Sequence, residues 1–492
     1  MTVSTQTKSR KREKDSDQTL FGFDSASPPP CRPGALTGRA AHQASIGSDF
    51  PPPPAEQAAV SPLHPVNPAN PVLRSFPPPS AQPAVVSLPD TLLAFREFGT
   101  GTRQAITRYP TPDGQVAELP AFINEYWTAK QRQASSLHEI SYRACFKPQL
   151  PRFFIERLTQ PGDIVYDPFM GRGTSLLEAA LLGRIPFGCD INPLSATLVR
   201  PRLNPPTLEQ VAQRLAQINL ESARDLPEEL LVFYHPDTLR QIVNLKDYLV
   251  GRREVQRMDP IDDWIAMVAL NRLTGHSSGF FSVYTLPPNQ AVSVKSQLKI
   301  NARRNQTPPP RNITAIMLKK SRILMSDLNA SARHTLAHVS PRTILVTGSA
   351  HDTPQIPTGS VSLAVTSPPF LDIVQYATDN WLRCWFLGID SASIKITVPK
   401  KIDVWQQVMT TVFHELHRIL KPGGHVAFEV GEVHAGKTRL EEAVLPCGIA
   451  AGLEPLLVLI NDQKFTKTAN CWGIDNMAKG TNTNRIVVFR RS

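Results

Sequence analysis

The fold class is decided by the stretch Ile164-Val165-Tyr166-Asp167-Pro168-Phe169-Met170-Gly171-Arg172-Gly173-Thr174. Its first three residues predict a short buried strand, which runs into a turn that contains two glycines. Apolar spacing then predicts a helix over 175–182 and a second strand over 186–189. A strand, a helix and a second strand in this order form a unit whose two strands are parallel. We therefore expect an α/β protein with a doubly wound, mainly parallel sheet.

The rest of the chain predicts a sheet that is interrupted in sequence by a helical insertion. The alternation of strands and helices resumes near Thr343, after about 140 residues of basic, mainly helical pattern. The expected later elements are strands over 343–346, 361–365 and 425–430, a helix over 405–420, and β-rich runs over 456–460 and 485–489. The predicted divisions are a disordered proline-rich tail (1–90), a first part of the sheet domain (91–204), an insertion (205–340) and a second part of the sheet domain (341–492).

Composition narrows the classes of function. The 492 residues carry 53 Lys and Arg against 42 Asp and Glu, so the net charge of +11 favours a polyanionic partner. No apolar run approaches the roughly 20 residues of a membrane span, and the start of the chain lacks the apolar core of a secretion signal. The six cysteines include no CxxC pair, so we expect reduced thiols, no zinc site and a cytoplasmic location.

The glycine turn and a later carboxylate together predict a nucleoside site. Small residues let a ligand approach the backbone closely, and the following helix offers free N–H groups. Asp190 ends the next predicted strand, where a carboxylate accepts hydrogen bonds from ribose hydroxyls. The turn lacks a full GxGxxG and a following GK[ST], so we expect a nucleoside without a pyrophosphate, with Asp167 near its charged end. The alternative is a turn that only joins a strand to a helix.

A second motif, Thr366-Ser367-Pro368-Pro369-Phe370, follows the predicted strand over 361–365. Two prolines fix the backbone and remove two N–H donors, so the turn presents carbonyl groups and a hydroxyl at the edge where parallel sheets bind ligands. These acceptors suit methylation of an exocyclic amine, because bonds from the amine to Ser367 and to the Pro368 carbonyl would draw its nitrogen toward tetrahedral geometry. Phe370 would stack on a base that has left the duplex. The alternative is a proline turn that merely ends a strand.

The two motifs together resemble those of the DNA amino-methyltransferases that use S-adenosylmethionine. The stretch 167–174 is similar to the cofactor loop of that family, 190–193 to its ribose motif, and 366–370 to its catalytic tetrapeptide in the Ser-Pro-Pro-aromatic form associated with cytosine-N4 enzymes. The stretch His138–Pro151 is similar to the helix that packs on the cofactor, and 420–424 to a later sheet motif. The resemblance implies a class I methyltransferase fold and S-adenosylmethionine as the cofactor.

The resemblance also implies roles for individual residues, and we expect no metal site. The implied catalytic residues are Ser367, Pro368, Pro369 and Phe370. The implied cofactor-binding residues are Lys147, Asp167, Phe169, Gly171, Gly173, Thr174, Asp190, Asn192, Ser349 and Thr366.

The insertion has a basic centre that suits nucleic acid. No acidic residue occurs from Asn271 to Arg322, and aromatic and amide residues lie between the bases. Such a segment favours phosphate contacts combined with contacts to base edges, although a solvated basic face is the alternative. The predicted DNA-binding residues are Arg272, Lys295, Lys299, Arg303, Arg304 and Arg311.

The sequence thus predicts a site-specific DNA methyltransferase that acts on a flipped base, with cytosine N4 favoured. The alternatives are adenine N6, guanine N2 in RNA, and a nucleic-acid-binding module without catalysis. The expected partner is double-stranded DNA near the nucleoid, without a membrane. A cognate restriction endonuclease is a possible further partner, and the sequence indicates no oligomeric state.

Overall fold

The computed structural model describes residues 87–492 except 112–113, 129–133, 143–145, 286–290, 370–375, 392–393, 395–398, 400, 431, 434–437 and 463–482. Nearly all of the predicted tail (1–90) and the predicted stacking residue Phe370 therefore lie outside the described residues. In the described part of the chain, no helix is both long enough and apolar enough to cross a membrane.

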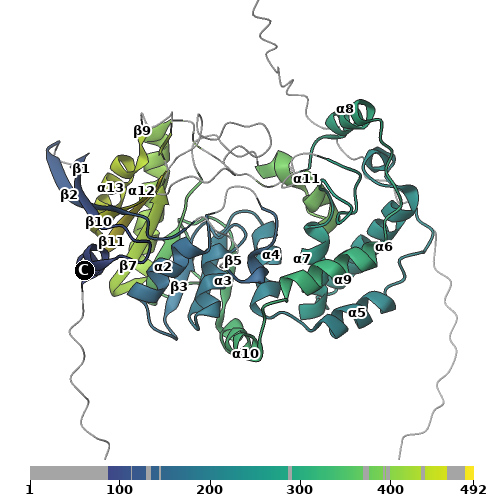
Figure 1. Cartoon of the computed structure of the whole chain (residues 1–492), viewed down its shortest axis with the longest axis horizontal. Helices are drawn as coiled ribbons and strands as arrows, with labels where there is room; N and C mark the ends of the chain where they lie inside the picture. The colour runs from purple at the N-terminus through teal and green to yellow at the C-terminus, as the bar shows by residue number, and fades with distance from the viewer. Residues whose placement is uncertain are drawn as a thin grey trace, which may run out of the picture. The chain divides into compact units, whose positions relative to one another are not determined.

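Nine strands form one sheet in the order β1-β2-β10-β11-β7-β6-β3-β4-β5 (Figure 1). Strands β7, β6, β3, β4 and β5 are parallel neighbours, whereas β11 runs antiparallel to both β7 and β10. The predicted doubly wound, mainly parallel sheet is thus confirmed. The bounds are β1 (Arg103–Pro110), β2 (Val116–Asn124), β3 (Ile164–Asp167), β4 (Ile185–Asp190), β5 (Ile344–Thr347), β6 (Val361–Thr366), β7 (Leu420–Val430), β10 (Glu454–Asp462) and β11 (Thr483–Arg490), with a separate pair of β8 (Glu432–Val433) and β9 (Thr438–Arg439).

Helices cover both faces of the sheet, as the alternation of side chains along its strands requires. Val165 of β3 packs in a hydrophobic cluster with α2 (Gln149–Leu158). The next residue, Tyr166, points to the other face and packs in a cluster with α12 (Ile402–Ile419) and α13 (Leu440–Ala450). The remaining helices of the sheet domain are α1 (Leu88–Ala94), α3 (Thr174–Leu181) and α4 (Leu194–Leu203).

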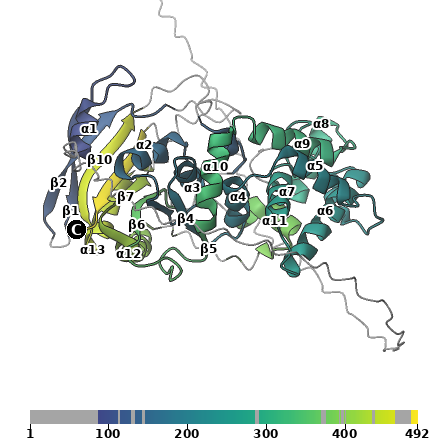
Figure 2. The same ribbon diagram turned by 90° about the horizontal axis from the view of Figure 1, so that it is seen from below.

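The insertion between β4 and β5 is helical, and its core is continuous with apolar side chains of α3 and α4. Trp264 is fully buried there, and its indole N–H donates to Ser321 Oγ over 3.0 Å. The view in Figure 2 shows the inserted helices grouped beside the sheet. Their bounds are α5 (Leu208–Gln217), α6 (Pro236–Glu254), α7 (Pro260–Leu270), α8 (Val294–Arg304), α9 (Ile313–Leu324) and α10 (Ala330–Val339), with 3₁₀ turns at Glu228–Val232 and Ser340–Arg342.

Helix α11 (Tyr376–Leu387) packs against this insertion. It follows β6 in the chain, yet its apolar side chains Leu382 and Phe386 belong to the same hydrophobic cluster as Trp264. The backbone N–H of Ala291 also donates to the Asp379 carbonyl over 3.3 Å. The segment that follows the predicted catalytic turn is therefore packed against the insertion.

Two parts of the fold differ from the sequence expectation. The hairpin of β1 and β2 was not predicted, because β1 is a mostly exposed edge strand whose Ile106 is 60% exposed. The helix expected by resemblance over His138–Pro151 begins only at Gln149, with α2. A 3₁₀ turn (Ser136–His138) precedes it, and the described residues between the two, 139–142 and 146–148, are not helical. Among these residues, the Ser141 N–H donates to the Asn271 side chain over 2.8 Å. This backbone group therefore forms a hydrogen bond to the insertion and not a hydrogen bond within a helix.

Candidate active site

The turn between β3 and α3 needs both of its glycines. Gly171 and Gly173 have φ angles of 48° and 74°, in the left-handed region that side chains other than glycine rarely adopt. A Cβ atom on Gly173 would lie 2.4 Å from Cγ2 of Val199 on α4. A Cβ on Gly171 would lie 3.5 Å from the ring of Tyr142. The turn is therefore held closely between α4 and the Tyr142 ring.

The Asp190 carboxylate is bound into the same turn. It accepts the Gly171 N–H at one oxygen and the Asn192 N–H at the other, both over 2.8 Å. Burial raises the pKa of Asp190, and these two N–H groups oppose that shift. The Asn192 side chain is buried, donating to Tyr142 Oη over 3.2 Å and accepting the Leu194 N–H over 3.1 Å. Asn192 therefore shapes the turn through its side chain.

Asp167 connects the two predicted motifs directly. One oxygen accepts the Thr366 hydroxyl over 2.6 Å and the Phe169 N–H over 3.0 Å, and the other accepts the Ser175 hydroxyl over 2.8 Å. Burial raises the pKa of this carboxyl to about 6, although the three donors favour its charged form. Because β3 and β6 are parallel neighbours, the glycine turn and the proline turn leave the sheet at the same edge.

The proline turn is fixed by residues of three other elements. The Ser367 side chain is hydrogen-bonded to Glu429 of β7, and Asn484 of β11 donates to the same carboxylate over 3.0 Å. Burial raises the pKa of Glu429, whereas both hydrogen bonds lower it. On the other side, the indole N–H of Trp405, on α12, donates to the Pro369 carbonyl over 3.1 Å.

The remaining predicted cofactor residues lie around the glycine turn. Thr174 is buried at the start of α3, and its hydroxyl accepts Arg172 Nε over 3.2 Å. Phe169 is partly buried within the turn, and Lys147 is partly buried just before α2. Ser349 follows Gly348, whose N–H donates to the Asp190 carbonyl over 3.0 Å, so β5 also ends beside the Asp190 segment.

The predicted DNA-binding residues do not form one uniform surface. Lys295, Lys299 and Arg303 are exposed along α8, as is Arg304, whose guanidinium lies 3.8 Å from the ring centre of Tyr284. Arg272 is partly buried, lies 4.1 Å from the Phe280 ring centre and donates to the Asn271 carbonyl over 2.6 Å. Burial lowers the pKa of Arg272 to about 10.

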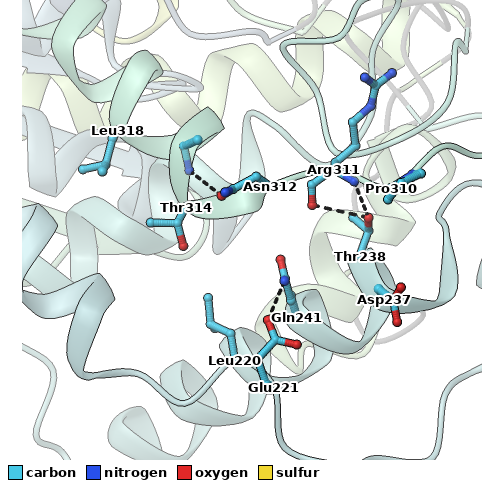
Figure 3. Close-up of a pocket in the computed structure, with 11 residues that line it drawn as sticks. Leu220, Glu221, Asp237, Thr238, Gln241, Pro310, Arg311, Asn312, Thr314 and Leu318 are labelled. Carbon is cyan, nitrogen blue, oxygen red and sulfur yellow. Dashed lines mark hydrogen bonds between the residues drawn. The ribbon is translucent and has the colours of Figure 1, made fainter.

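Arg311 lines a cavity of about 560 Å³ between α6 and the start of α9. Its backbone N–H donates to Thr238 Oγ1 over 2.8 Å, and its guanidinium extends away from the cavity (Figure 3). Asn312 caps α9 by accepting the Ala315 N–H over 2.9 Å. Apart from Arg311, the cavity is lined by none of the predicted site residues, so it is distinct from the sheet edge.

The sequence reasoning missed the residues that support the two turns. Glu429 is a buried carboxylate inside the apolar strand run 425–430, and this charged position was the available signal. Trp405, Tyr142 and Asn484 carry no comparable signal, because their contacts join segments distant in sequence. Among the described residues, no group of three or more His, Cys, Asp or Glu side chains could hold a metal ion.

The strand order and the paired turns define a class I methyltransferase fold, in which the reversed strand β11 lies between β7 and β10. Residues 103–199 match the family model of the DNA methylases, in its N6/N4 form. The match to this family thus covers residues 103–199, which contain the glycine turn and Asp190.

Three relatives show how far the sequence similarity extends. The type II methyltransferase M.MvaI of Kocuria varians is 32% identical over 126 residues, which are 25% of this chain and 24% of the relative. M.BsoBI of Geobacillus stearothermophilus is 21% identical over 57% of this chain and 58% of its own length. A tRNA (guanine(10)-N2)-dimethyltransferase of Methanocaldococcus jannaschii is 38% identical over 13% of this chain and 18% of its own length. The matches thus span less than two thirds of each of these relatives.

Proposed function

We propose that this chain is an S-adenosylmethionine-dependent DNA methyltransferase that methylates the exocyclic amine of a base, with cytosine N4 as the favoured target. The observation that carries the proposal is the 2.6 Å hydrogen bond from Thr366 to Asp167. It links the turn that would hold the cofactor to the turn that would hold the amine. The type II methyltransferases among the relatives support DNA as the substrate.

The first turn fits S-adenosylmethionine in its shape and in its acceptors. Gly171 and Gly173 allow the left-handed backbone of a tight turn that ends at the start of α3. Asp190 uses two N–H donors, and a carboxylate has about four acceptor positions, so it retains acceptors for ribose hydroxyls. When bound, the cofactor supplies an electrophilic methyl group. Lys147, Phe169 and Ser349 are the further proposed contacts, while Asp167, Thr174, Asn192 and Thr366 hold the turn in place.

The second turn would orient the amine. Ser367 donates its own proton to the buried Glu429 carboxylate, which directs the hydroxyl lone pairs away from Glu429. Those lone pairs and the Pro368 carbonyl would accept the two N–H groups of the amine. Trp405 holds the Pro369 carbonyl and so fixes the turn. Preorganised acceptors of this kind lower a barrier mainly through orientation. Glu429 is thus a positioning residue in this proposal.

The target base is assigned from the first residue of the second turn. Serine in this place is the form associated with cytosine-N4 enzymes, whereas Asp or Asn is more frequent in adenine-N6 enzymes. Phe370 remains the proposed stacking residue. Methylation of guanine N2 in RNA is the second candidate, because one relative is a tRNA dimethyltransferase with 38% identity over 63 residues.

Nucleic acid would contact both α8 and the carboxyl edge of the sheet. Lys295, Lys299 and Arg303 are exposed on α8, and no ion pair to them is formed within the described part of the chain. Ala291, which precedes α8, bonds to Asp379 of α11, and α11 follows the proline turn. Phosphate contacts of α8 would therefore be coupled to the position of the base.

The test is nucleoside mass spectrometry of DNA and RNA from cells that express the chain or its Ser367→Ala variant. The proposal predicts N4-methylcytosine in DNA with the unaltered chain and none with the variant. N6-methyladenine in DNA would reassign the base, and N2-methylguanosine in RNA would favour the second candidate. Identical nucleosides with and without the chain would contradict a catalytic function.

A further inference from the structure

A buried arginine of α11, the helix that follows the proline turn, reaches the segment that covers the glycine turn. Arg383 is only 8% exposed. One nitrogen of its guanidinium donates to Asn380 Oδ1 within the same helix over 3.0 Å, and another donates to the Ser141 carbonyl over 3.0 Å. Arg383 thus joins α11 to a backbone group that lies 242 residues earlier in the chain.

The backbone of Ser141 is held from two sides. Its N–H donates to Asn271 Oδ1 over 2.8 Å, and the Asn271 amide donates in turn to the Met267 carbonyl of α7 over 2.9 Å. Its carbonyl accepts Arg383. A partly buried backbone carbonyl without a donor costs stability, so loss of Arg383 would let this segment move toward other donors or water.

The next residue, Tyr142, contacts the glycine turn itself. Its ring lies so close to Gly171 that a Cβ there would be 3.5 Å from it. The Tyr142 hydroxyl accepts the Asn192 side chain over 3.2 Å, and the Asn192 N–H donates to the Asp190 carboxylate over 2.8 Å. A shift of Ser141 would therefore move Tyr142 relative to Gly171 and to the segment that places the Asp190 carboxylate.

We propose that Arg383 is a positioning residue for the cofactor, which acts through Ser141 and Tyr142 on the turn at Gly171. This inference rests on the proposed function and deepens it, because it assigns part of the support of the cofactor site to the helix after the proline turn. A binding site keeps its geometry only when the residues behind its contact groups are themselves fixed. Arg383 acts on the cofactor through the backbone and not by contact.

The experiment measures binding of S-adenosylhomocysteine, the product form of the cofactor, by calorimetry, together with urea unfolding. For Arg383→Met we expect about tenfold weaker binding, as for one lost hydrogen bond from a charged donor. Arg383→Lys can still donate one bond and should lose about threefold. Arg333→Met is the matched control, since Arg333 donates to the carbonyl groups of Pro205 over 3.0 Å and of Pro206 over 3.3 Å, in the insertion. It should bind within about twofold of the unaltered chain.

A double-mutant cycle separates this role from a general effect on the fold. Tyr142→Phe removes the hydroxyl that accepts the Asn192 side chain and should weaken binding about threefold. Because Arg383 acts through Tyr142, the double variant should bind about tenfold more weakly than the unaltered chain, as Arg383→Met does, and not about thirtyfold. Tyr142→Phe combined with Arg333→Met should show independent effects. A merely structural role of Arg383 would lower the urea midpoint without this non-additivity.

Independent effects of Arg383→Met and Tyr142→Phe would overturn the inference, as would binding by a folded Arg383→Met variant within about twofold of the unaltered chain. If Arg383→Met does not fold, the cycle is made with Arg383→Lys, and independent effects would again overturn the inference. If the unaltered chain binds no S-adenosylhomocysteine, the proposed function fails together with this inference. Binding by the unaltered chain with independent effects in the cycle contradicts the role of Arg383 alone.

Discussion

The carboxyl edge of the sheet and the inserted helix α8 differ in the surroundings of their charged side chains. At the sheet edge, hydrogen-bond donors surround each carboxylate: Thr366 and Ser175 on Asp167, and the Gly171 N–H on Asp190. On α8, by contrast, Lys295 and Lys299 extend into solvent. Satisfied buried polar groups give a rigid site, whereas solvated cations give long-range attraction to a polyanion. Under the proposed function, the sheet edge would position the reacting groups and α8 would attract the substrate.

The largest effect at the sheet edge is expected from a substitution of Gly173. We expect Gly173→Ala to weaken S-adenosylmethionine binding by at least about 100-fold and to lower the free energy of unfolding by about 3 kcal/mol, through backbone strain and overlap with Val199. Gly359→Ala is the control, because Gly359 has φ of +66° but nothing within 4 Å of its added Cβ. Calorimetry and urea unfolding measure both variants. Equal effects would show that overlap with Val199 does not matter.

A substitution of Glu429 tests whether the orientation of Ser367 affects kcat independently of cofactor affinity. For Glu429→Gln we expect kcat to fall by roughly 10- to 100-fold with unchanged affinity for S-adenosylmethionine, because the amide no longer fixes the Ser367 hydroxyl as an acceptor. The wild-type rate should fall as the pH falls through the raised pKa of Glu429, and the variant should lack this limb. A pH series of kcat measures this. If kcat and its pH dependence were unaltered in the variant, Glu429 would not orient Ser367 for the reaction.

The exposed lysines of α8 should contribute to the salt-dependent affinity for DNA and not to the stability of the fold. Replacing Lys295 and Lys299 together with Gln should reduce the log–log salt slope of DNA binding by about 1.8 and leave the stability unchanged. The control replaces Arg342 and Arg490, exposed cations at the opposite edge of the sheet, where no change in slope is expected. Fluorescence anisotropy over a salt series checks both pairs. The same slope change in both would mean that net charge, and not α8, determines binding.

For Asp167 we expect an effect on stability that depends on pH. Its pKa in the folded protein is raised from 3.8 to about 6, so the folded state holds its proton more tightly than the unfolded state. The resulting stabilisation, up to about 3 kcal/mol, is present below pH 4 and is lost as the pH rises through 6. Urea unfolding from pH 4 to pH 7 should show this loss in the wild type and not in Asp167→Asn. If the free energy of unfolding changed with pH in the same way in both proteins, the raised pKa would not belong to Asp167.

The sequence predicted those parts of the fold and site that local chemistry determines. Gly171 and Gly173 were recognised because a tight turn needs glycine, and the apolar runs of β3 and β6 predicted parallel strands. Glu429 and Trp405 were missed, because their contacts with Ser367 and Pro369 depend on how distant segments pack. Arg272 was predicted as a DNA contact; its stacking on Phe280 and its partial burial could not be predicted from composition alone.

The central claim is that the sheet edge orients an amine for methyl transfer through Ser367. Its most direct test is single-turnover transfer of labelled methyl groups to DNA from cells that lack the chain, with Ser362→Ala as the control. Ser362 lies near the start of β6, the strand that precedes Ser367, and donates to Asp163 over 2.8 Å. The account predicts a rate at least about 100-fold lower for Ser367→Ala, with S-adenosylmethionine affinity within about twofold, and a nearly normal rate for Ser362→Ala. Equal rates in the two variants would contradict it.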